Sequence, residues 1–376
     1  MDNITSSKTS IVIDLGSSSI KVGLGNQENP SFVFPNYIGK IKYPKIGQKS
    51  IEILENEKSS KYFIGNDCKK YQGVLKLNYP MEHGIFSDPE DISTILNYIN
   101  YNLEVNNIQM SEHPILISEP LLNPKKNREK IAKELFDKLK VKALFFASQP
   151  ILSMFSTSTT SGIILESGDG VTQSCICYDG YAIPSSFKRI NFGGREITEY
   201  LQLLLNKKGY SLMSSDGFQI VKKIKEELCC CGIEEESKYI LPDDSEIVVG
   251  NEKHQVTELL FDPSINGYEY ESVQKIIANS LNQININIDL RSQLYGNILL
   301  SGGNMKFNGM KERLHKEIKK LSPKNIKVGL HLSSNAENAC WIGGSVISGL
   351  EAFKEMYVTE KEYREKTDQI IHIKAI

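Results

Sequence analysis

Two short segments of the sequence combine a carboxylate with a glycine turn, a pattern that can grip phosphate. Three apolar residues precede Asp14 in the first segment and Glu166 in the second, and each carboxylate is followed by a glycine, Gly16 or Gly168. Turns of glycine and serine point backbone N–H groups into a concavity that binds phosphate oxygens. A carboxylate beside such a turn can hold a divalent metal through water, because Mg²⁺ keeps much of its hydration shell. The segments therefore predict a polyphosphate clamp with Asp14 and Glu166 on the metal side.

The two segments also form an internal repeat, separated by almost half of the chain. Repetition at that distance predicts two related lobes. The 376 residues also exceed the ~250–300 at which a single hydrophobic core stops growing. Lys21, beyond the first turn, adds positive charge for the phosphates. A third glycine turn, at Gly302 and Gly303, ends another apolar run and would let a flat base approach closely. These features predict a nucleotide cleft between two lobes.

Short apolar runs alternate with helical patterns along the whole chain, which predicts an α/β fold. The β-branched runs at 11–13 and 163–165 predict strands that lead into the two turns. Polar composition predicts a mobile surface excursion at 39–65 and a loop tip at 234–238. Apolar spacing predicts helices at 128–139, with Asn127 as N-cap, at 217–228, with Val221, Ile224 and Leu228 on one face, and around Met310, Leu314 and Ile318.

Composition excludes several classes of function. Lys and Arg total 44 against 46 Asp and Glu, so the net charge is −2 and no basic excess supports direct nucleic-acid contact. No apolar run approaches the ~20 residues that span a bilayer, and residues 1–10 are polar, so we expect no direct membrane contact. The seven cysteines show no metal-ligand spacing, and we expect reduced, buried thiols.

The chain resembles actin and the actin-related proteins over essentially its full length. Two of the matching segments, Phe34-Pro-Asn-Tyr37 and Tyr79-Pro-Met-Glu-His-Gly84, are more similar to centractin, the filament subunit of dynactin, than to conventional actin. The other motifs that carry the resemblance are Asp14-x-Gly-Ser17, Glu112-His-Pro114, Leu122-Asn-Pro-Lys-Lys-Asn-Arg-Glu129, Ser167-Gly-Asp-Gly-Val-Thr172, Ile224-Lys-Glu226, Ser301-Gly-Gly303 and Trp341-Ile-Gly-Gly-Ser345.

The resemblance implies an actin-like two-lobed ATPase fold, with a duplicated ribonuclease H-like core, four subdomains and a central nucleotide cleft. It assigns 1–35, 80–156 and 339–376 to subdomain 1, and 36–79, which holds the equivalent of the DNase-binding loop, to subdomain 2. It assigns 157–192 and 269–338 to subdomain 3, and 193–268 to subdomain 4.

The resemblance also implies ATP or ADP as ligand, with Mg²⁺ or Ca²⁺ held through water by Asp14 and Glu166. Gln149 matches the residue that orients the attacking water, and Gln173 stands beside it. His83 matches a phosphate-sensing histidine, and Asn123 and Arg189 border the phosphate exit. The matched nucleotide-binding positions are Asp14, Gly16, Ser17, Ser18 and Lys21 in the first loop, Gly168, Asp169, Gly170 and Val171 in the second, and Gly194, Lys225, Glu226, Gly302, Gly303 and Phe307 around ribose and adenine.

Each of these positions also has a structural interpretation. Asn123 before Pro124 can cap a turn. Lys225 and Glu226 can be solvent-facing helix charges, and Gln149 can satisfy a buried carbonyl group. The resemblance favours the functional interpretation of each.

Three departures from the family pattern lie around the reaction chemistry. Glu166 replaces an aspartate, Ser18 replaces a glycine in the first loop, and Gln173 replaces a histidine. An amide can hold a water but cannot accept its proton near neutral pH, whereas histidine can. We therefore expect intact ATP binding with slow or altered hydrolysis, in which Gln149, Gln173, Asp14 and Glu166 are the residues concerned.

Other departures concern assembly and affinity. Glu337 stands where a lysine is expected near adenine, the segment 39–65 is longer than the family's loop, the loop at 234–238 is shortened, and the ending 371–376 differs. We expect short filaments of this chain with dynactin-type or actin-binding partners, in the cytoplasm and cytoskeleton. The alternatives are a freely polymerising divergent actin, a non-polymerising nuclear subunit of a chromatin-remodelling complex, and a sugar-kinase or Hsp70-type ATPase on the same fold.

Overall fold

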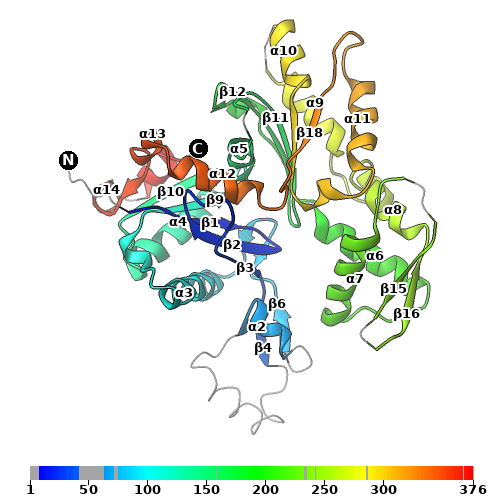
Figure 1. The fold of residues 1–376 in the computed structure, drawn as a ribbon, viewed down its shortest axis with the longest axis horizontal. Coiled ribbons are helices and arrows are strands. Elements are labelled where there is room, and N and C mark those ends of the chain that lie inside the picture. Colours follow the sequence, from blue (N-terminus) through cyan, green and yellow to red (C-terminus); the bar gives the residue numbers. More distant parts are fainter. Residues whose placement is uncertain are drawn as a thin grey trace. The chain divides into compact units, whose positions relative to one another are not determined.

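The computed structural model describes residues 8–41, 63–71, 75–157, 159–232, 235–241, 243–284, 287–366 and 368–375. The chain divides into two compact units and has a mixed α/β fold, as the sequence predicts (Figure 1). The first unit comprises Met1–Ile117, Asn123–Phe146 and Ser348–Ala375. The second comprises Ser118–Leu122, Ala147–Ile347 and Ile376. The predicted boundaries of the four subdomains stay a prediction.

The first unit is built on a sheet with the strand order β19-β10-β9-β1-β2-β3. β1 and β2 form an antiparallel hairpin, and β1 also runs parallel to β9, with Ile13 opposite Ile117. The strands are β1 Ile11–Leu15, β2 Ser19–Leu24, β3 Phe32–Pro35, β9 Ile115–Glu119, β10 Ala143–Ser148 and β19 Val358–Thr359. All five residues of β1 are buried, because the strand lies inside the sheet.

Helices of the first unit pack an apolar stripe on this sheet. α3, Pro89–Val105, begins where the Asp88 side chain accepts a hydrogen bond from the Glu90 N–H, and Pro89 occupies its first turn. Its buried residues include Ile92, Ile95, Leu96, Ile99 and Leu103. The other helices of this unit are α2 Asn66–Lys69, η1 Met110–Glu112, α4 Lys125–Lys133, the π-helix η2 Glu134–Lys138, α13 Glu351–Lys354, α14 Glu360–Lys366 and α15 Gln369–Ile373.

The predicted N-cap at Asn127 is wrong. α4 begins at Lys125, directly after Pro124, so Asn127 lies inside the helix. Its side chain joins two other segments instead: Asn127 Oδ1 accepts the Phe86 N–H at 3.4 Å, and Asn127 Nδ2 donates to Asn123 Oδ1 at 3.0 Å. The predicted helix is also not α-helical to its end, because 134–138 form the wider turn of η2.

A three-stranded sheet, in the order β5-β4-β6, holds the remainder of the first unit. Tyr37, Phe63, Cys68, Leu75 and Leu77 form its apolar cluster. The excursion predicted at 39–65 starts and ends in this sheet, and 42–62 lie outside the described residues. The strands are β4 Ile38–Ile41, β5 Phe63–Ile64 and β6 Leu75–Asn78, and a further hairpin pairs β7 Met81–Glu82 with β8 Ile85–Phe86.

The second unit repeats the hairpin plan of the first. β11 and β12 are antiparallel, and β11 runs parallel to β17, as β1 does to β9. Each hairpin encloses a four-residue loop, between the pair Leu15–Ile20 and the pair Ser167–Thr172. The sheet order is β13-β12-β11-β17-β18, with β14 also on β12. Its strands are β11 Gly162–Ser167, β12 Thr172–Tyr178, β13 Tyr181–Ala182, β14 Lys188–Ile190, β17 Ile298–Ser301 and β18 Leu330–Leu332.

Helices of the second unit confirm two of the predicted stripes. Val221 and Ile224 are buried in α7, and Met310, Leu314 and Ile318 are buried in α11. The helices are α5 Gln149–Phe155, α6 Gly194–Lys207, α7 Ser215–Leu228, α8 Glu252–Glu258, α9 Val273–Asn282, α10 Ile288–Tyr295, α11 Met310–Leu321 and α12 Ala339–Ser348, with short turns η3 Pro184–Ser186, η4 Pro263–Asn266 and η5 Gly303–Lys306.

The loop predicted at 234–238 is wrong in its second half. Ser237 and Lys238 belong to β15, Ser237–Ile240, which pairs with β16, Glu246–Val249. Lys238 and Glu246 form an exposed ion pair across this ribbon at 2.7 Å. The polar composition that suggested a loop is therefore that of a solvent-facing strand.

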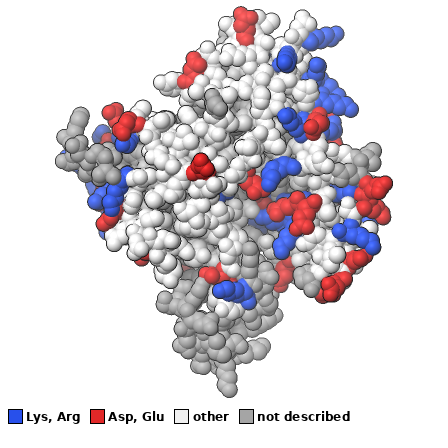
Figure 2. All heavy atoms as spheres, in the orientation of Figure 1, with Lys and Arg blue, Asp and Glu red and all other residues white. Residues whose placement is uncertain are grey.

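The surface agrees with the balanced composition. On the face drawn in Figure 2, acidic and basic side chains intermingle over the region of α6, α7 and α8. No helix in the described ranges is both long enough and apolar enough to cross a bilayer.

All seven cysteines are free and buried, as predicted. Burial raises the pKa of Cys177 to about 11 and the pKa of Cys229 and Cys231 to about 12. Because the thiolate is the reactive form, iodoacetamide at about pH 8 should modify the folded protein slowly. Mass spectrometry should then count all seven cysteines as modified after unfolding in denaturant. Rapid labelling of the folded protein would contradict this prediction.

Candidate functional site

A buried ion pair lies next to the turn of the first hairpin. Asp14 and Lys21 face each other in the β1–β2 register, and Lys21 Nζ lies 2.8 Å from Asp14 Oδ2. Their exposed fractions are 3 % and 9 %. Removing either partner would leave a buried charge uncompensated, which is strongly destabilising. The lysine predicted to face phosphate is therefore also the counter-ion of the carboxylate predicted to face the metal.

The first turn is held by side chains from elsewhere in the unit. Asn36 Nδ2 donates to the Gly16 carbonyl oxygen at 2.9 Å, and the Asn36 N–H donates to the Ser18 carbonyl oxygen at 2.9 Å. The Gly84 N–H donates to Ser17 Oγ at 3.1 Å, next to His83, whose φ is +47°. The Ser17 N–H, in contrast, donates to no described residue. The turn thus has a fixed shape and keeps a donor for an anion.

The second turn has the same arrangement with different partners. The Gly168 N–H donates to the Val171 carbonyl oxygen at 2.9 Å, which closes the loop. The Gly168 carbonyl oxygen accepts Asn304 Nδ2 at 2.8 Å and the Gly194 N–H at 2.9 Å. Gly168 and Gly16 are equivalent positions of the repeat, and an asparagine amide holds the carbonyl of each. The N–H groups of Asp169 and Val171 donate to no residue in the described part of the chain, and Gly170 between them is buried.

The glycine pair after β17 has two different roles. Gly302 has a φ of +89°, and a Cβ there would lie 2.2 Å from the Ser167 carbonyl oxygen, so only glycine fits. At Gly303 an added Cβ would meet no atom within 4 Å. Gly302 therefore serves packing inside the unit, whereas Gly303 borders open space where the sequence predicts a base.

Lys225 and Glu226, adjacent in α7, have different environments. Lys225 is 3 % exposed, and its Nζ donates to the Gly194 carbonyl oxygen at 2.7 Å. Burial lowers the pKa of Lys225, while the nearby Asp169 carboxylate opposes that shift. Glu226 is exposed, and Phe307 belongs to the apolar core of the unit. Lys225 is therefore not a solvent-facing helix charge.

Two serine hydroxyls, linked by hydrogen bonds, hold the carboxylate of Glu166. Glu166 Oε2 accepts from Ser153 Oγ at 3.0 Å, and Ser301 Oγ donates to Ser153 Oγ at 3.1 Å. Ser153 is on α5 and fully buried. No motif in the sequence marks Ser153, although its spacing of four from Gln149 places both on one face of a helix.

Gln149 and Gln173 are joined in a second row of hydrogen bonds. Gln173 Oε1 accepts the Leu121 N–H at 2.8 Å, and Gln173 Nε2 donates to Gln149 Oε1 at 3.2 Å. Gln149 Nε2 donates to Ser118 Oγ at 3.4 Å. Gln173 is fully buried. The structure brings the two predicted residues into contact and leaves neither as a proton acceptor, because both are amides.

The two residues predicted to border the phosphate exit belong to different units. Asn123 Oδ1 accepts from Asn127 Nδ2 at 3.0 Å in the first unit. Arg189, in the second unit, donates from Nη1 to the Leu121 carbonyl oxygen at 3.0 Å, and its pKa is lowered by burial. Arg189 therefore contacts the same short segment as Gln173.

The two carboxylates predicted to face a metal do not by themselves form a metal site. Among the described residues, no three His, Cys, Asp or Glu side chains gather as metal ligands. Asp14 in the first unit and Glu166 in the second each offer one carboxylate, so a divalent ion at either position would need water or ligand oxygens as its other ligands. The sequence alone does not indicate a role for Asn36 and Asn304, which hold the loop carbonyls, because their partners are distant in the chain.

The protein-family model described as Actin matches residues 5–376 of the chain. This range contains both hairpins and the glycine pair.

Asn304 provides a test of the second turn. Asn304→Ala removes the donor to Ser167 Oγ at 2.9 Å and to the Gly168 carbonyl oxygen at 2.8 Å. The two acceptors keep their other partners, the Gly194 N–H and Thr172 Oγ1, so the loss is that of two hydrogen bonds at about 0.5–1.5 kcal/mol each. We therefore expect the free energy of unfolding in urea to fall by about 2 kcal/mol. Asn97→Ala, at an exposed position of α3, is the control and should change it by less than ~0.5 kcal/mol. Equal effects of the two variants would show that Asn304 does not hold the turn.

Proposed function

We propose, because this chain belongs to the actin family, that it binds ATP or ADP with Mg²⁺ or Ca²⁺, hydrolyses ATP slowly and assembles into short filaments within a larger complex. Family membership makes the chain an actin-like cytoskeletal protein. Binding of the nucleotide, assembly into a filament and association with a partner complex are what we propose beyond family membership.

The observation that carries nucleotide binding is the repeated hairpin. In each turn an asparagine holds the carbonyl of the equivalent glycine, Gly16 or Gly168. Backbone N–H groups of the same turns, at Ser17, Asp169 and Val171, lack a partner among the described residues. Donors without partners in a fixed, half-buried loop favour an anion with several oxygens. A phosphate group offers several oxygens to such a loop, whereas a carboxylate offers two.

A bound divalent cation would neutralise phosphate charge and so help phosphoryl transfer. Asp14 and Glu166 are the residues proposed to hold its water shell. Ser153 fixes the Glu166 carboxylate, and Lys21 balances the charge of Asp14. Gly303 offers space for a base, and Lys225 holds the Gly194 carbonyl oxygen beside it in the same unit.

Slow hydrolysis is supported by the hydrogen-bonded glutamine pair. Gln149 can orient a water by hydrogen bonding, but its neighbour Gln173 cannot take up the proton that the water must lose. A general base contributes typically 10²–10⁴-fold to such a step, so its loss leaves positioning and electrostatics as the main contributions.

Gly303 gives a test of binding that does not disturb the fold. Gly303→Val places its side chain where no protein atom lies within 4 Å of the added Cβ. We expect the melting temperature without nucleotide to stay the same and the affinity for a fluorescent ATP analogue to fall at least about tenfold, or ~1.4 kcal/mol. Gly303→Ala should have a smaller effect on affinity. Unchanged affinity in Gly303→Val would remove Gly303 from the site.

The pH profile of turnover tests the hydrolysis proposal. Phosphate release by the unaltered protein should be nearly independent of pH between about 6 and 8, because no group with a pKa near ~6.5 takes the proton.

Two variants test the roles of the glutamines. Gln173→His should raise turnover, and the rate should increase with pH as the imidazole loses its proton. Gln149→Ala should lower turnover and retain nucleotide. Turnover after assembly equal to that of conventional actin would contradict slow hydrolysis.

Sedimentation with conventional actin tests the assembly proposal. A net charge of −2 leaves little repulsion between copies of the chain. We expect short polymers of this chain and no uniform copolymer with labelled actin. Affinity purification with mass spectrometry separates the partners: dynactin-type subunits support the proposal, whereas chromatin-remodelling subunits or actin-binding proteins alone favour the nuclear or the freely polymerising alternative.

A further inference from the structure

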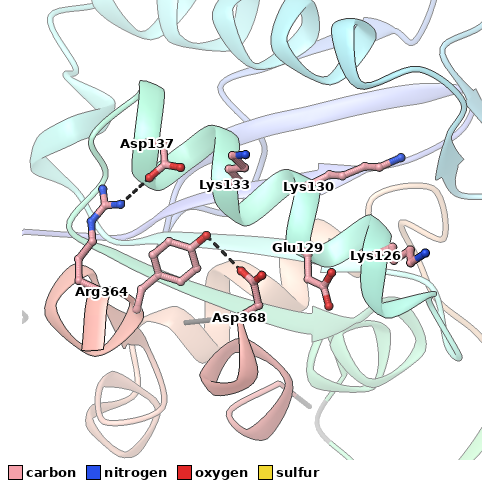
Figure 3. A pocket seen from close by; sticks show the side chains of 8 residues that line it. Lys126, Glu129, Lys130, Lys133, Asp137, Arg364 and Asp368 are labelled. Carbon is pink, nitrogen blue, oxygen red and sulfur yellow. Dashed lines mark hydrogen bonds and ion pairs between the residues drawn. The ribbon is translucent and has the colours of Figure 1, made fainter. Parts of the chain in front are cut away.

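A groove on the first unit lies outside the residues proposed to bind nucleotide. It runs between α4 and η2 on one side and α14 and the start of α15 on the other, with a volume of about 570 Å³ (Figure 3). Lysines occupy the α4 side, and Tyr363, Arg364 and Asp368 occupy the other.

Three lysines form a row along the α4 side. Lys126, Lys130 and Lys133 follow the i, i+4, i+7 spacing that places side chains on one face of a helix. At 1.5 Å per residue their Cα positions are ~6 Å and ~4.5 Å apart along the axis. All three are exposed and have no acidic partner among the described residues.

The fourth cation of the groove is already paired. Arg364 Nη1 donates to Asp137 Oδ1 at 2.5 Å, and Arg364 Nη2 donates to the Phe136 carbonyl oxygen at 3.2 Å. Figure 3 shows Arg364 reaching across to Asp137 on η2. This contact joins the two walls at one end of the groove and leaves the three lysines as its uncompensated charges.

The floor of the groove is preorganised. Phe136 and Tyr363 stack with ring centroids 4.5 Å apart, and the Tyr363 hydroxyl donates to Asp368 Oδ1 at 3.2 Å. Glu129 is paired as well, since its Oε1 lies 3.0 Å from His372 Nε2. A rigid floor lowers the entropy cost of binding a segment on it.

We propose that this groove docks an extended acidic segment of a partner protein, with carboxylates at alternate positions. Alternate side chains of an extended chain point to one side and repeat every ~6.6–6.8 Å. The lysine positions are ~6 Å and ~4.5 Å apart along the helix axis, and the long lysine side chains can span the difference. Three carboxylates of the groove, Glu129, Asp137 and Asp368, repel a dense polyanion such as a polyphosphate or an anionic lipid surface. A peptide with spaced charges can pair with the lysines while avoiding them. The groove shares no residue with the proposed nucleotide site, and docking in it would be a function in addition to the one proposed above.

Fluorescence anisotropy on the full chain tests the proposal. The probe is a fluorescein-labelled nine-residue peptide with glutamate at alternate positions and alanine between them. Lys126→Ala, Lys130→Ala and Lys133→Ala combined should weaken its binding about tenfold, because each exposed ion pair contributes a factor of ~1.4–5. Added salt should weaken binding to the unaltered protein.

The matched control removes the same charge elsewhere. Lys311, Lys316 and Lys319 on α11 are exposed and also lack an acidic partner in the part of the chain that the structure describes. Their combined change to alanine should alter peptide binding less than about threefold, since only net charge changes. A peptide with the same glutamates in one block should bind the unaltered protein more weakly than the alternating peptide.

A charge reversal separates recognition from misfolding. Lys126→Glu, Lys130→Glu and Lys133→Glu combined should lose the acidic peptide and gain a peptide with lysine at the same alternate positions, with an unchanged melting temperature. Three results would overturn the proposal: equal loss in the α4 and α11 variants, equal binding of the block and alternating peptides, or binding of phosphoinositide vesicles without binding of the peptide.

Discussion

One carbonyl oxygen, that of Gly168, fixes the arrangement on which the second unit depends. It accepts a hydrogen bond from Gly194 at the start of α6 and another from Asn304 after β17, so three segments distant in the sequence share one anchor. Because this carbonyl oxygen is already hydrogen-bonded, the polar backbone groups of the turn that can still bind a ligand are N–H groups. The first unit reaches the same state with Asn36 and Gly16. The repeat therefore preserves the electrostatic character of the loop together with its shape.

α5 contacts two of the residues in which this chain departs from the family pattern, Glu166 on β11 and Gln173 on β12. Gln149 and Ser153, one helical turn apart, contact Gln173 and Glu166, which are paired with each other across β11 and β12. Each unusual side chain is satisfied by a neighbour: the Leu121 N–H serves Gln173, and the Ser153 hydroxyl serves Glu166. The substitutions can thus alter proton transfer while the packing around them remains complete.

The sequence predicted what depends on local patterns. The two hairpins, the glycine turn after β17, the stripes of α7 and α11 and the buried thiols all follow from spacing and residue type. The N-cap at Asn127 failed because Pro124 starts the helix earlier, and the loop at 234–238 failed because an exposed strand has the polarity of a loop. The roles of Asn36, Asn304 and Ser153 could not be predicted, since each acts on a residue that only the fold brings near.

The π-helix η2 affects which side chains before and after it share a face. Successive residues of an α-helix are related by a rotation of about 100° around the helix axis. One additional residue in a wide turn therefore rotates the side chains that precede the turn relative to those that follow it. In this chain η2 carries Asp137, which meets Arg364. A single-residue insertion or deletion here would therefore change which charges face outward without any substitution, and the helix could acquire a new binding specificity through its length alone.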